Sequence, residues 1–357
     1  MVAFYAILLF VLCGMQAVMG AWFVTVWPQL SGRWFILWGP LLLSVLTLVA
    51  MAYSRVHYQG LGQAAYYGAY VWFGFVFLGF CWCALCALFY RVLGWTHLPQ
   101  TWLGFFSLAG LVVIWAMALW GGFSEPKIKK ISVQIPNMPK LKIALLSDSH
   151  LGMGVSLARF ERALQKIEQE NPDVLFSLGD IFEYGPNPEK YAARLKQVKT
   201  PLGTYGVLGN HEYYVGYQNS KKFLKDAGVV LLENTSVLLP NGVQVAGVKD
   251  IHTAHVRPEE VTQLLASLPR ENPTIFLSHT PKYAEIASRA GADLMFSGHT
   301  HNGQLWPFNY LVRLQFPRVY GLFDVEGMQF YITSGLFYWG IPLRFLAPAE
   351  IPIIEVN

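Results

Sequence analysis

The first third of this chain lacks almost every charged side chain, and this absence limits its possible folds more than any other feature. Charged residues make up 13% of the 357 residues, whereas a soluble domain has about 25%. Residues 1–122 contain no Asp, Glu or Lys, and their only charged side chains are Arg33, Arg55 and Arg91. Every acidic residue lies at or after Glu125. The chain therefore consists of two chemically different parts.

The uncharged part contains long apolar stretches. A helix needs about 20 apolar residues to cross a bilayer. The stretches that meet this length are Ala3–Val24, Trp34–Tyr53, Tyr66–Tyr90 and Trp102–Gly122. The first lacks a charged start and a clear A-x-A site, which favours a retained anchor over a cleaved signal peptide. We expect an α-helical membrane domain of four transmembrane helices over residues 1–122, because a soluble protein of this composition could not cover so much apolar surface.

The cysteines all lie in these expected spans, and they are Cys13, Cys81, Cys83 and Cys86. A metal cluster at C-W-C-A-L-C is one interpretation, but no histidine lies close in sequence. Buried cysteine commonly acts as a small apolar residue, and we expect that role here. The second part of the chain has no cysteine, so cysteine usage gives no information on the redox compartment.

The charged part of the chain has the pattern of an α/β domain. Residues 123–139 are expected to form a linker and leading strand, where three prolines disfavour a helix. Over residues 140–357, strand-like and helical stretches alternate. The expected helices are Ser156–Glu170, Pro188–Lys199, Gln218–Ala227 and Pro258–Ser267. A hairpin is expected at Pro240–Asn241–Gly242, because Asn-Gly is a strong turn signal. The expected late strands are Met328–Thr333 and Ile351–Val356.

Five apolar runs in this part each lead into polar side chains suited to metal binding. The runs are Ile143–Leu146, Val174–Leu178, Tyr205–Leu208, Thr274–Leu277 and Asp293–Phe296. The polar residues that follow them are Asp148, His150, Asp180, Asn210, His279, His299 and His301. In open α/β sheets, ligands bind at the carboxyl ends of strands, and imidazole is the commonest protein metal ligand. The pattern therefore predicts a metal site at one sheet edge.

Two pairs among these residues are spaced two apart, namely Asp148 with His150 and His299 with His301. Side chains at positions i and i+2 leave a strand on the same face. We therefore expect the members of each pair to point together beyond the end of their strand.

The ordered set D-x-H, G-D, G-N-H-E, H and G-H-T-H resembles the motifs of the calcineurin-like metallophosphoesterases. The resemblance covers roughly residue 140 to the C-terminus, and the tail from Pro342 to Ile351 looks like the membrane-associated bacterial branch of that superfamily. One departure is Asn302, since Gly often follows the second histidine; this affects loop shape more than ligation. The resemblance implies an α/β metallophosphoesterase domain of two packed mixed sheets flanked by helices.

The resemblance also implies a site for two divalent metal ions. Metal one would be bound by Asp148, His150, Asp180 and His301. Metal two would be bound by Asp180, Asn210, His279 and His299. Mixed Asp, Asn and His ligands without thiolate suit Mn, Fe or Zn. Such a metal pair lowers the pKa of a bound water, so that hydroxide becomes available for hydrolysis.

His211 is the residue that the resemblance assigns to catalysis rather than ligation. Its family role is to hydrogen-bond the phosphoryl group or to protonate the leaving oxygen; a structural role behind the ligands is the alternative. Glu212 is expected to orient the loop. His252 and His255 are expected to be exposed in the loop after the hairpin.

These features predict a membrane-anchored, metal-dependent phosphoesterase that cleaves a phosphodiester or pyrophosphate bond. The stretch Leu305–Val312 follows the site and could contact acyl chains or pack in the core. A lipid-linked substrate such as UDP-2,3-diacylglucosamine is one candidate, and small soluble phosphodiesters are another. A non-catalytic membrane sensor or scaffold is the alternative from another class, although no ligand position has been lost. The sequence has no P-loop motif and no long basic run for nucleic acid.

Charge near the expected spans predicts their orientation. Four crossings place both ends of the membrane domain on one side. That side would hold Arg55, Lys127, Lys129 and Lys130, and the other would hold Arg33 and Arg91. Cytoplasmic loops carry an excess of Lys and Arg. The bias predicts a cytoplasmic catalytic domain on the inner membrane of a bacterium, although many proteins similar to this enzyme type are exported.

Overall fold

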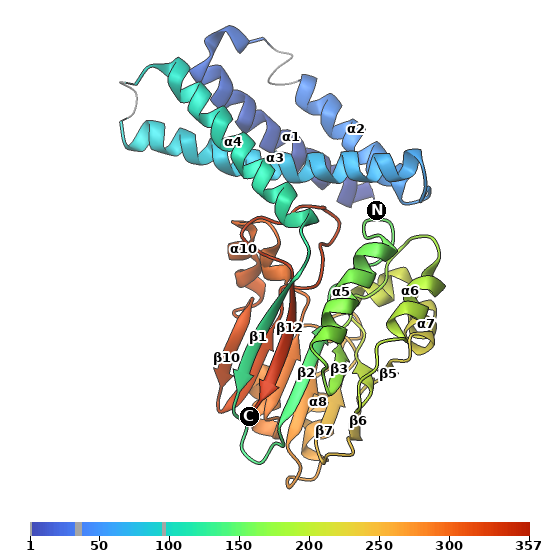
Figure 1. Cartoon of the computed structure of the whole chain (residues 1–357). Coiled ribbons are helices and arrows are strands. Elements are labelled where there is room, and N and C mark those ends of the chain that lie inside the picture. Colours follow the sequence, from blue (N-terminus) through green and yellow to red (C-terminus); the bar gives the residue numbers. More distant parts are fainter. Residues whose placement is uncertain (1, 33–37, 95–97) are drawn as a thin grey trace. The chain divides into compact units, whose positions relative to one another are not determined.

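The computed structural model describes residues 2–32, 38–94 and 98–357, and it divides the chain into two compact units (Figure 1). The first, here called the helical unit, comprises Met1–Phe123 together with Gly340–Leu346. The second, the α/β unit, comprises Ser124–Trp339 and Ala347–Asn357. A short segment near the C-terminus thus belongs to the unit formed by the N-terminal helices.

The helical unit contains long apolar helices. Its helices are α1 (Val2–Val26), the 3-10 turn η1 (Pro28–Leu30), α2 (Gly39–Ser54), α3 (Leu61–Val92) and α4 (Gln100–Phe123). Among the described residues, three stretches are long and apolar enough to cross a membrane, namely Tyr5–Val26, Leu61–Val92 and Gln100–Phe123. Large apolar side chains such as Phe10, Trp102 and Trp120 are exposed on these helices, as expected of surfaces that face lipid.

The predicted second span is shorter in the described part of the chain. The helix α2 has 16 residues, fewer than the roughly 20 needed for a full crossing. The predicted span began at Trp34, which lies outside the described residues, as does Arg33 of the orientation prediction. Within the described residues, three helices are long enough to span a membrane and α2 is a shorter apolar helix, where four spans were expected.

Side chains inside the helical unit explain how its helices pack. Trp22 donates its indole N–H to Ser107 Oγ at 3.0 Å, and this pair joins α1 to α4. Cys83 and Cys86 are buried in an apolar cluster that includes Trp22, so these two cysteines have the apolar role that was expected. Small residues also allow close approach: a Cβ on Gly79 would lie 2.4 Å from Met19 Cε.

The segment Gly340–Leu346 is built into the helical unit by polar and steric contacts. The Tyr66 hydroxyl on α3 donates to Gly340 O at 2.7 Å. The main-chain N–H of Arg344 donates to Ala118 O on α4 at 3.0 Å. A Cβ on Gly122 would lie 2.2 Å from Pro342 O, so glycine is needed there for the segment to pack against α4.

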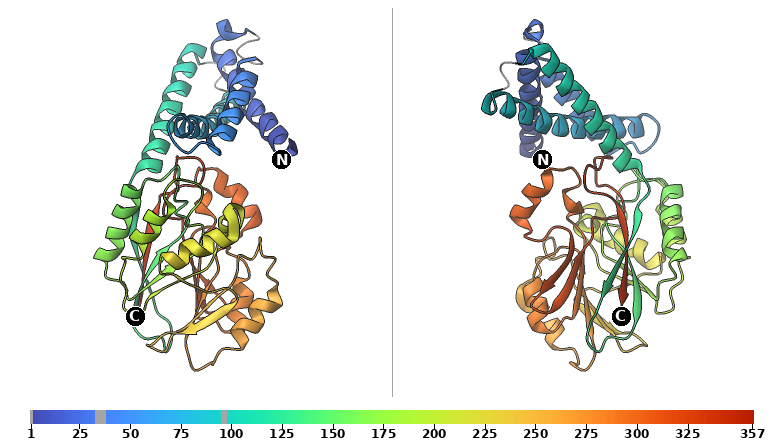
Figure 2. Two further views of the ribbon diagram at one scale, coloured as in Figure 1. Left: turned by 90° about the vertical axis from the view of Figure 1, so that its right-hand side faces the viewer. Right: turned by 60° about the vertical axis from the view of Figure 1, so that its left-hand side comes forward.

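The α/β unit contains two mixed six-stranded sheets, as predicted (Figures 1 and 2). The first has the order β1 (Lys127–Val133), β12 (Glu350–Val356), β2 (Leu141–Leu146), β3 (Val174–Ser177), β4 (Thr204–Gly206), β5 (Val230–Leu231). The second has the order β10 (Gly321–Val325), β11 (Met328–Ile332), β9 (Leu294–Ser297), β8 (Thr274–Leu277), β7 (Gln244–Gly247), β6 (Thr235–Leu238). In each sheet the central strands are parallel: β2–β3–β4 in one, and β7–β8–β9 in the other.

The two sheets pack face to face because alternate residues of their strands point to opposite sides. On β2, Ile143 and Leu145 belong to a buried cluster that also contains Phe296 of β9. The intervening Ala144 belongs to a different cluster, in which it packs with Phe160 of α5 (Leu157–Gln169) and other helical residues. Apolar side chains on both faces of a strand are typical of parallel sheets covered on both sides.

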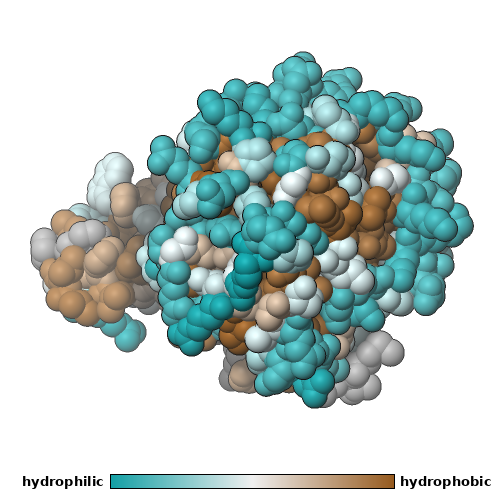
Figure 3. All heavy atoms as spheres, turned by 90° about the horizontal axis from the view of Figure 1, so that it is seen from below, coloured by the Kyte–Doolittle hydropathy of each residue, from teal (hydrophilic) through white to brown (hydrophobic). Residues whose placement is uncertain are grey.

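The flanking helices agree broadly with the predicted ones. They are α5 (Leu157–Gln169), α6 (Pro188–Leu195), α7 (Asn210–Asp226), α8 (Pro258–Ala266), α9 (Ala284–Ala290) and α10 (Phe308–Gln315). The predicted helix Gln218–Ala227 is only the second part of α7, which begins eight positions earlier and bends at Gly216, where φ is 129°. The predicted hairpin is confirmed, since β6 and β7 pair antiparallel. Seen from below, the surface of the α/β unit is mainly hydrophilic with smaller apolar patches (Figure 3).

Candidate metal centre

The polar residues singled out in the sequence lie in loops at the carboxyl ends of β2, β3, β8 and β9 and at the start of α7. Of these residues, His299 is partly exposed. The other members are buried, and they are Asp148, His150, Asp180, Asn210, His279 and His301. The structure therefore brings all the predicted ligands together at the edges of the two sheets.

The backbone at this centre is not the extended strand that the spacing argument assumed. Five of the residues have positive φ: 52° at Asp148, 42° at His150, 54° at Asp180, 72° at His299 and 49° at His301. Non-glycine residues seldom adopt this left-handed conformation, and clusters of such residues occur at active sites and ligand clamps. The expectation that His299 and His301 point together from one strand face is wrong, because the chain has left its strand and turns between them.

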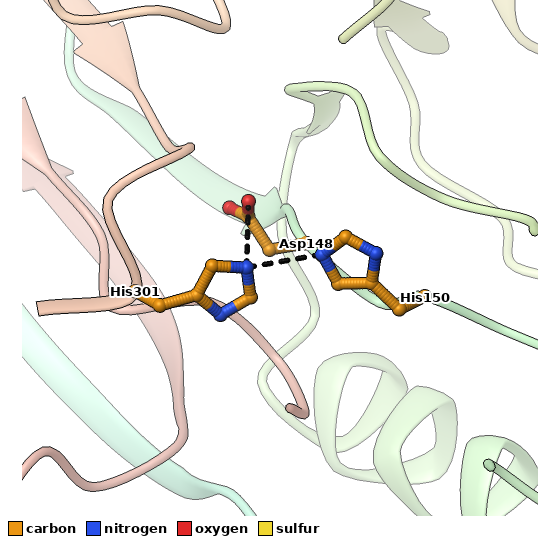
Figure 4. Close-up of side chains that lie close together, drawn as sticks. All are labelled: Asp148, His150 and His301. Carbon is orange, nitrogen blue, oxygen red and sulfur yellow. Dashed lines mark hydrogen bonds and ion pairs between the residues drawn. The ribbon is translucent and has the colours of Figure 1, made fainter. Parts of the chain in front are cut away.

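One group of side chains consists of Asp148, His150 and His301 (Figure 4). His150 Nε2 and His301 Nε2 lie 3.0 Å apart, and His301 Nε2 lies 3.4 Å from Asp148 Oδ1 (Figure 4). Each of the three offers a ligand atom within 4.8 Å of the others. We refer to this group as the His150 cluster.

A second group contains Asp180, His279 and His299, with Asn210 beside them, and we call these four the His279 cluster. Asn210 Oδ1 lies 2.9 Å from His299 Nδ1 and 3.2 Å from His279 Nε2. His279 Nδ1 lies 2.7 Å from Leu178 O, which requires a ring proton on Nδ1 and directs Nε2 toward the cluster.

Asp180 connects the two clusters. Its Oδ2 atom lies 3.2 Å from His279 Nε2 and 3.9 Å from His150 Nε2. Burial opposes ionisation of this carboxyl, but the charge of His279 and then that of His211 hold the pKa of Asp180 well below its usual range. A buried carboxylate thus lies between histidine nitrogens of both clusters.

The donor set fits divalent cations. Imidazole nitrogens, carboxylate oxygens and one amide oxygen converge without any thiolate, a combination suited to Mn, Fe or Zn. For His299, burial and then the charge of His279 lower the pKa to about 4, so the ring is neutral near pH 7 and has a lone pair for a metal.

Two glycines in the motifs leave room for these ligands. A Cβ on Gly209 would lie 2.1 Å from Asp180 Oδ1. A Cβ on Gly298 would lie 2.1 Å from Ser147 Oγ and 2.3 Å from Asp148 Oδ2. All three contacts are shorter than any real side chain allows, so only glycine fits beside these carboxylates.

Glu212 has the orienting role that was expected of it. Its side chain is buried and accepts main-chain N–H groups from Asp180 at 2.9 Å, Ile181 at 2.7 Å and Gly209 at 2.7 Å. These bonds join the loop after β3 to the start of α7. Glu212 therefore fixes Asp180 and Asn210 relative to each other.

Glu183 belongs to the site although it was not singled out in the sequence. Its Oε1 atom lies 2.6 Å from His150 Nδ1 and 2.7 Å from His211 Nδ1. Burial opposes the charge of Glu183, but His150 and then His211 outweigh it and lower its pKa to about 2. In the sequence, only its position three residues after Asp180, in G-D-I-F-E, could have drawn attention to Glu183. That position does not predict its contacts with His150 and His211 unless the path of the loop is known.

His211 lies beside the two clusters and forms a third possible metal-binding group with His150 and Glu183. Its main-chain N–H donates to Asp180 Oδ1 at 2.9 Å, and its ring meets the rings of Tyr214 and Trp339 edge-on at 5.4 and 5.6 Å. Burial disfavours the charged ring, but Asp180 and then Glu183 outweigh burial and raise the pKa of His211 to about 9. Bound cations would add positive charge and oppose this effect.

Histidines elsewhere in the α/β unit do not join the centre. His252 and His255 are exposed in the turn after β7, as expected. They take no part in the possible metal-binding groups found among the described residues.

Comparison with known proteins agrees with this geometry. The family model for calcineurin-like phosphoesterases matches residues 141–303. An uncharacterized metallophosphoesterase of Helicobacter pylori is 35% identical over 258 residues, which cover 70% of this chain and 69% of that protein. The chain therefore belongs to the calcineurin-like metallophosphoesterases, a family of metal-dependent phosphoester hydrolases.

Two further relatives extend the comparison. An uncharacterized metallophosphoesterase of Campylobacter jejuni is 34% identical over 238 residues, covering 65% of this chain and 63% of that protein. A zebrafish transmembrane protein with a metallophosphoesterase domain is 31% identical over 273 residues, covering 70% of this chain and 62% of that protein. The matches thus span slightly less than two thirds of the length of these two relatives.

Proposed function

We propose that this protein is a membrane-anchored dimetal phosphoesterase that hydrolyses a phosphodiester or pyrophosphate bond. The observation that carries the proposal is the position of Asp180, whose Oδ2 lies 3.2 Å from His279 Nε2 and 3.9 Å from His150 Nε2. A carboxylate between two histidine clusters suits ions about 3.5–4 Å apart, as in two-metal phosphatases.

The residues would divide the work of binding as follows. One cation would be held by Asp148, His150, Asp180 and His301. The other would be held by Asp180, Asn210, His279 and His299. Two divalent ions supply Lewis acidity and lower the pKa of a bound water to about 7. The protein holds their ligands in a fixed, mostly buried arrangement, so that little reorganisation is needed when substrate binds.

His211 is the residue best suited to act on the substrate itself. Glu183 holds its Nδ1 atom at 2.7 Å, which leaves Nε2–H to donate to a phosphoryl oxygen or to the leaving oxygen. Before cations bind, the pKa of His211 is raised to about 9, which favours the protonated ring required of a proton donor. The exposed rings of Tyr214 and Trp339 beside it offer apolar surface to the rest of the substrate.

A lipid-linked substrate is our preferred candidate, and the pyrophosphate of UDP-2,3-diacylglucosamine is one example. The same chain carries helices that can span a membrane. A pocket of about 260 Å³ also lies beside the centre, lined by residues that include Lys282, Tyr283 and Phe316. The Phe316 ring lies edge-on to His299 at 5.2 Å, so a group bound in this pocket would be next to the His279 cluster.

Hydrolysis of small soluble phosphodiesters is the second candidate, because nothing in the metal clusters themselves requires a lipid. A non-catalytic sensor or scaffold is less well supported. A protein that only binds a ligand would have no need for every position of both ligand sets, and the structure brings all of them together.

The test is hydrolysis by the purified full-length protein in nanodiscs with Mn, Fe or Zn. The substrates are bis(p-nitrophenyl) phosphate, UDP-2,3-diacylglucosamine and its deacylated counterpart. We expect metal-dependent hydrolysis of the first and higher kcat/KM for the acylated nucleotide than for the deacylated one. Equal kcat/KM for the last two would remove the lipid from the proposal, and no metal-dependent hydrolysis of any substrate would contradict the phosphoesterase function.

We further propose that the α/β unit faces the cytoplasm of a bacterial cell. The lysines at the start of β1, Lys127, Lys129 and Lys130, follow α4 directly and favour the cytoplasmic side. The side of the membrane on which the N-terminus lies depends on the number of helices that cross the bilayer. That number depends on whether the 16-residue α2 crosses it. C-terminal fusions test the placement: a fluorescent protein should be bright and alkaline phosphatase inactive, whereas the opposite pair would place the α/β unit outside.

A further inference from the structure

The helix α10 (Phe308–Gln315) exposes the side chains that a soluble protein would bury. It has no buried residue. Tyr310, Leu311 and Leu314 are exposed, the last two at 56% and 85%. Positions i, i+1 and i+4 share one side of a helix, so these three form a continuous apolar strip. In an ordinary amphipathic helix the apolar strip faces the core, and here it faces away from the protein.

The residues around this strip have the composition of a membrane interface. Trp306 and Phe308 are also exposed, and the Trp306 and Tyr310 rings contact each other edge-on. Arg313 is exposed on the same helix, and no acidic residue occurs between residues 303 and 323. Exposed Trp, Tyr, Phe and Leu beside a basic residue are typical of segments that lie in the headgroup layer of a bilayer. We call residues 306–314 the α10 surface.

The connection between α4 and β1 would keep the α/β unit close to a bilayer. The helix α4, which is long enough to span a membrane, ends at Phe123, and β1 begins at Lys127. Only residues 124–126 connect them, a length of about 10 Å when extended. Such a short tether raises the effective concentration of lipid at the α/β unit, so that a modest apolar surface is sufficient for docking.

The α10 surface is attached to the metal centre at both of its ends. At its start, Gly303 lies against the main chain of Asn309, where a Cβ on the glycine would be 2.4 Å from the Asn309 nitrogen. Past its end, Phe316 contacts the ring of His299, and Thr300 Oγ1 donates to Val319 O at 2.6 Å. The turn that carries His299 and His301 is therefore packed against both ends of α10.

From these observations we propose that the α10 surface docks on the lipid bilayer that holds the helical unit, and so places the metal centre at headgroup depth. The occupant is the interfacial layer of the membrane, and not a soluble partner. Docking would give the metal centre access to the phosphate of a lipid-linked substrate, and this consequence rests on the proposed function. The docking itself is a separate physical statement and can be measured without any activity.

Depth in the bilayer tests the docking directly. In the full chain, with Cys13, Cys81, Cys83 and Cys86 replaced by Ala, a spin label is attached at Leu314→Cys in nanodiscs of phosphatidylethanolamine and phosphatidylglycerol. The matched control is Leu238→Cys on β6, a leucine of the α/β unit that is 54% exposed. We expect the label at 314 to be more accessible to oxygen than to a water-soluble nickel complex, and the label at 238 to show the reverse.

Two results would overturn the docking. A label at 314 that is as accessible to nickel as the one at 238 would place α10 in water. A label that is shielded from both reagents would assign the surface to a protein contact, either with the helical unit or with a second copy. Neither result depends on whether the enzyme is active.

Activity tests the consequence for the substrate. In the double variant Leu311→Ser/Leu314→Ser, the rate of hydrolysis of a bilayer-embedded lipid phosphodiester or pyrophosphate should fall about tenfold, because both substituted side chains lose apolar contact with lipid. It should retain its activity on bis(p-nitrophenyl) phosphate, and Leu238→Ser should retain both. Equal loss on both substrates, or loss on neither, would contradict the link between α10 and lipid access. A wild type inactive on both would instead contradict the proposed function and leave the label result intact.

Discussion

The two histidine clusters of the metal centre are held in place by different means. In the His279 cluster, His279 is fully buried and its Nδ1 atom faces the main-chain oxygen of Leu178 at 2.7 Å. In the His150 cluster, the equivalent contact of His150 is with Glu183, whose side chain is 23% exposed and also contacts His211. The His279 cluster is thus held by the main chain, whereas the His150 cluster is connected through Glu183 to His211, the residue proposed to act in catalysis.

This difference predicts that the two halves respond unequally to substitution. A carbonyl at the end of a buried strand cannot move without disturbing the sheet, so the His279 cluster should be the more rigid half. A carboxylate shared by two histidines transmits a change at one of them to the other. Substitutions around His150 should therefore affect metal binding and catalysis together.

The largest effect is expected from Asp180→Ala, because Asp180 is the residue that both halves share. Hydrolysis should fall to the uncatalysed background, and metal content should fall for both ions. Metal analysis and hydrolysis of bis(p-nitrophenyl) phosphate check this, with the exposed Asp226→Ala as control. Two ions still bound together with retained activity would show that Asp180 is not a bridge.

A smaller but still severe loss is expected from His279→Ala. The His279 cluster should lose its ion while the His150 cluster keeps its own, and the rate should fall by roughly 10³-fold. The mirror variant His150→Ala should retain the other ion. Metal content measured for both variants sharpens the comparison, and loss of both ions from either one would show that the halves do not bind independently.

His211→Ala should separate chemistry from ligation. The variant should bind as much metal as the wild type but hydrolyse its substrate about 10²-fold more slowly, as expected on loss of a proton donor. The exposed His252→Ala should match the wild type in both respects. Reduced metal content in His211→Ala would instead indicate a structural role behind the ligands.

The smallest effect is expected from Glu183→Gln, which keeps the shape of the side chain but removes its charge. Affinity for the ion at the His150 cluster should fall about tenfold, while the ion at the His279 cluster should be unaffected. Metal titration followed by equilibrium dialysis checks this against the exposed Glu189→Gln. An equal loss of affinity for both ions would contradict the asymmetry attributed to Glu183.

Much of the fold was predictable because it depends on local patterns. Apolar runs that end in Asp, Asn or His revealed the strands and the converging polar residues, and Asn241–Gly242 revealed the hairpin. The reason given for convergence was incomplete: the positive φ angles at Asp148 and His301 show that tight loops, not strand pleating, aim the side chains. The rule that alternate side chains point to the same face holds only as far as the last hydrogen-bonded residue of a strand.

Features that depend on long-range packing could not be predicted. Glu183 becomes part of the site only because the loop after β3 carries it back to His150 and His211. Similarly, the stretch Leu305–Val312 reads equally well as core or surface, and only the structure shows that most of α10 is exposed. The segment Gly340–Leu346 gives no local sign that it packs with the N-terminal helices.

The most direct test of the central claim is metal content measured together with activity on one preparation of the full-length wild type. Elemental analysis should find about two divalent ions per chain when the protein is prepared with Mn, Fe or Zn. Removal with a chelator should abolish hydrolysis of bis(p-nitrophenyl) phosphate, and adding the metal back should restore it in proportion to occupancy. Full hydrolytic activity in protein stripped of metal would contradict the account.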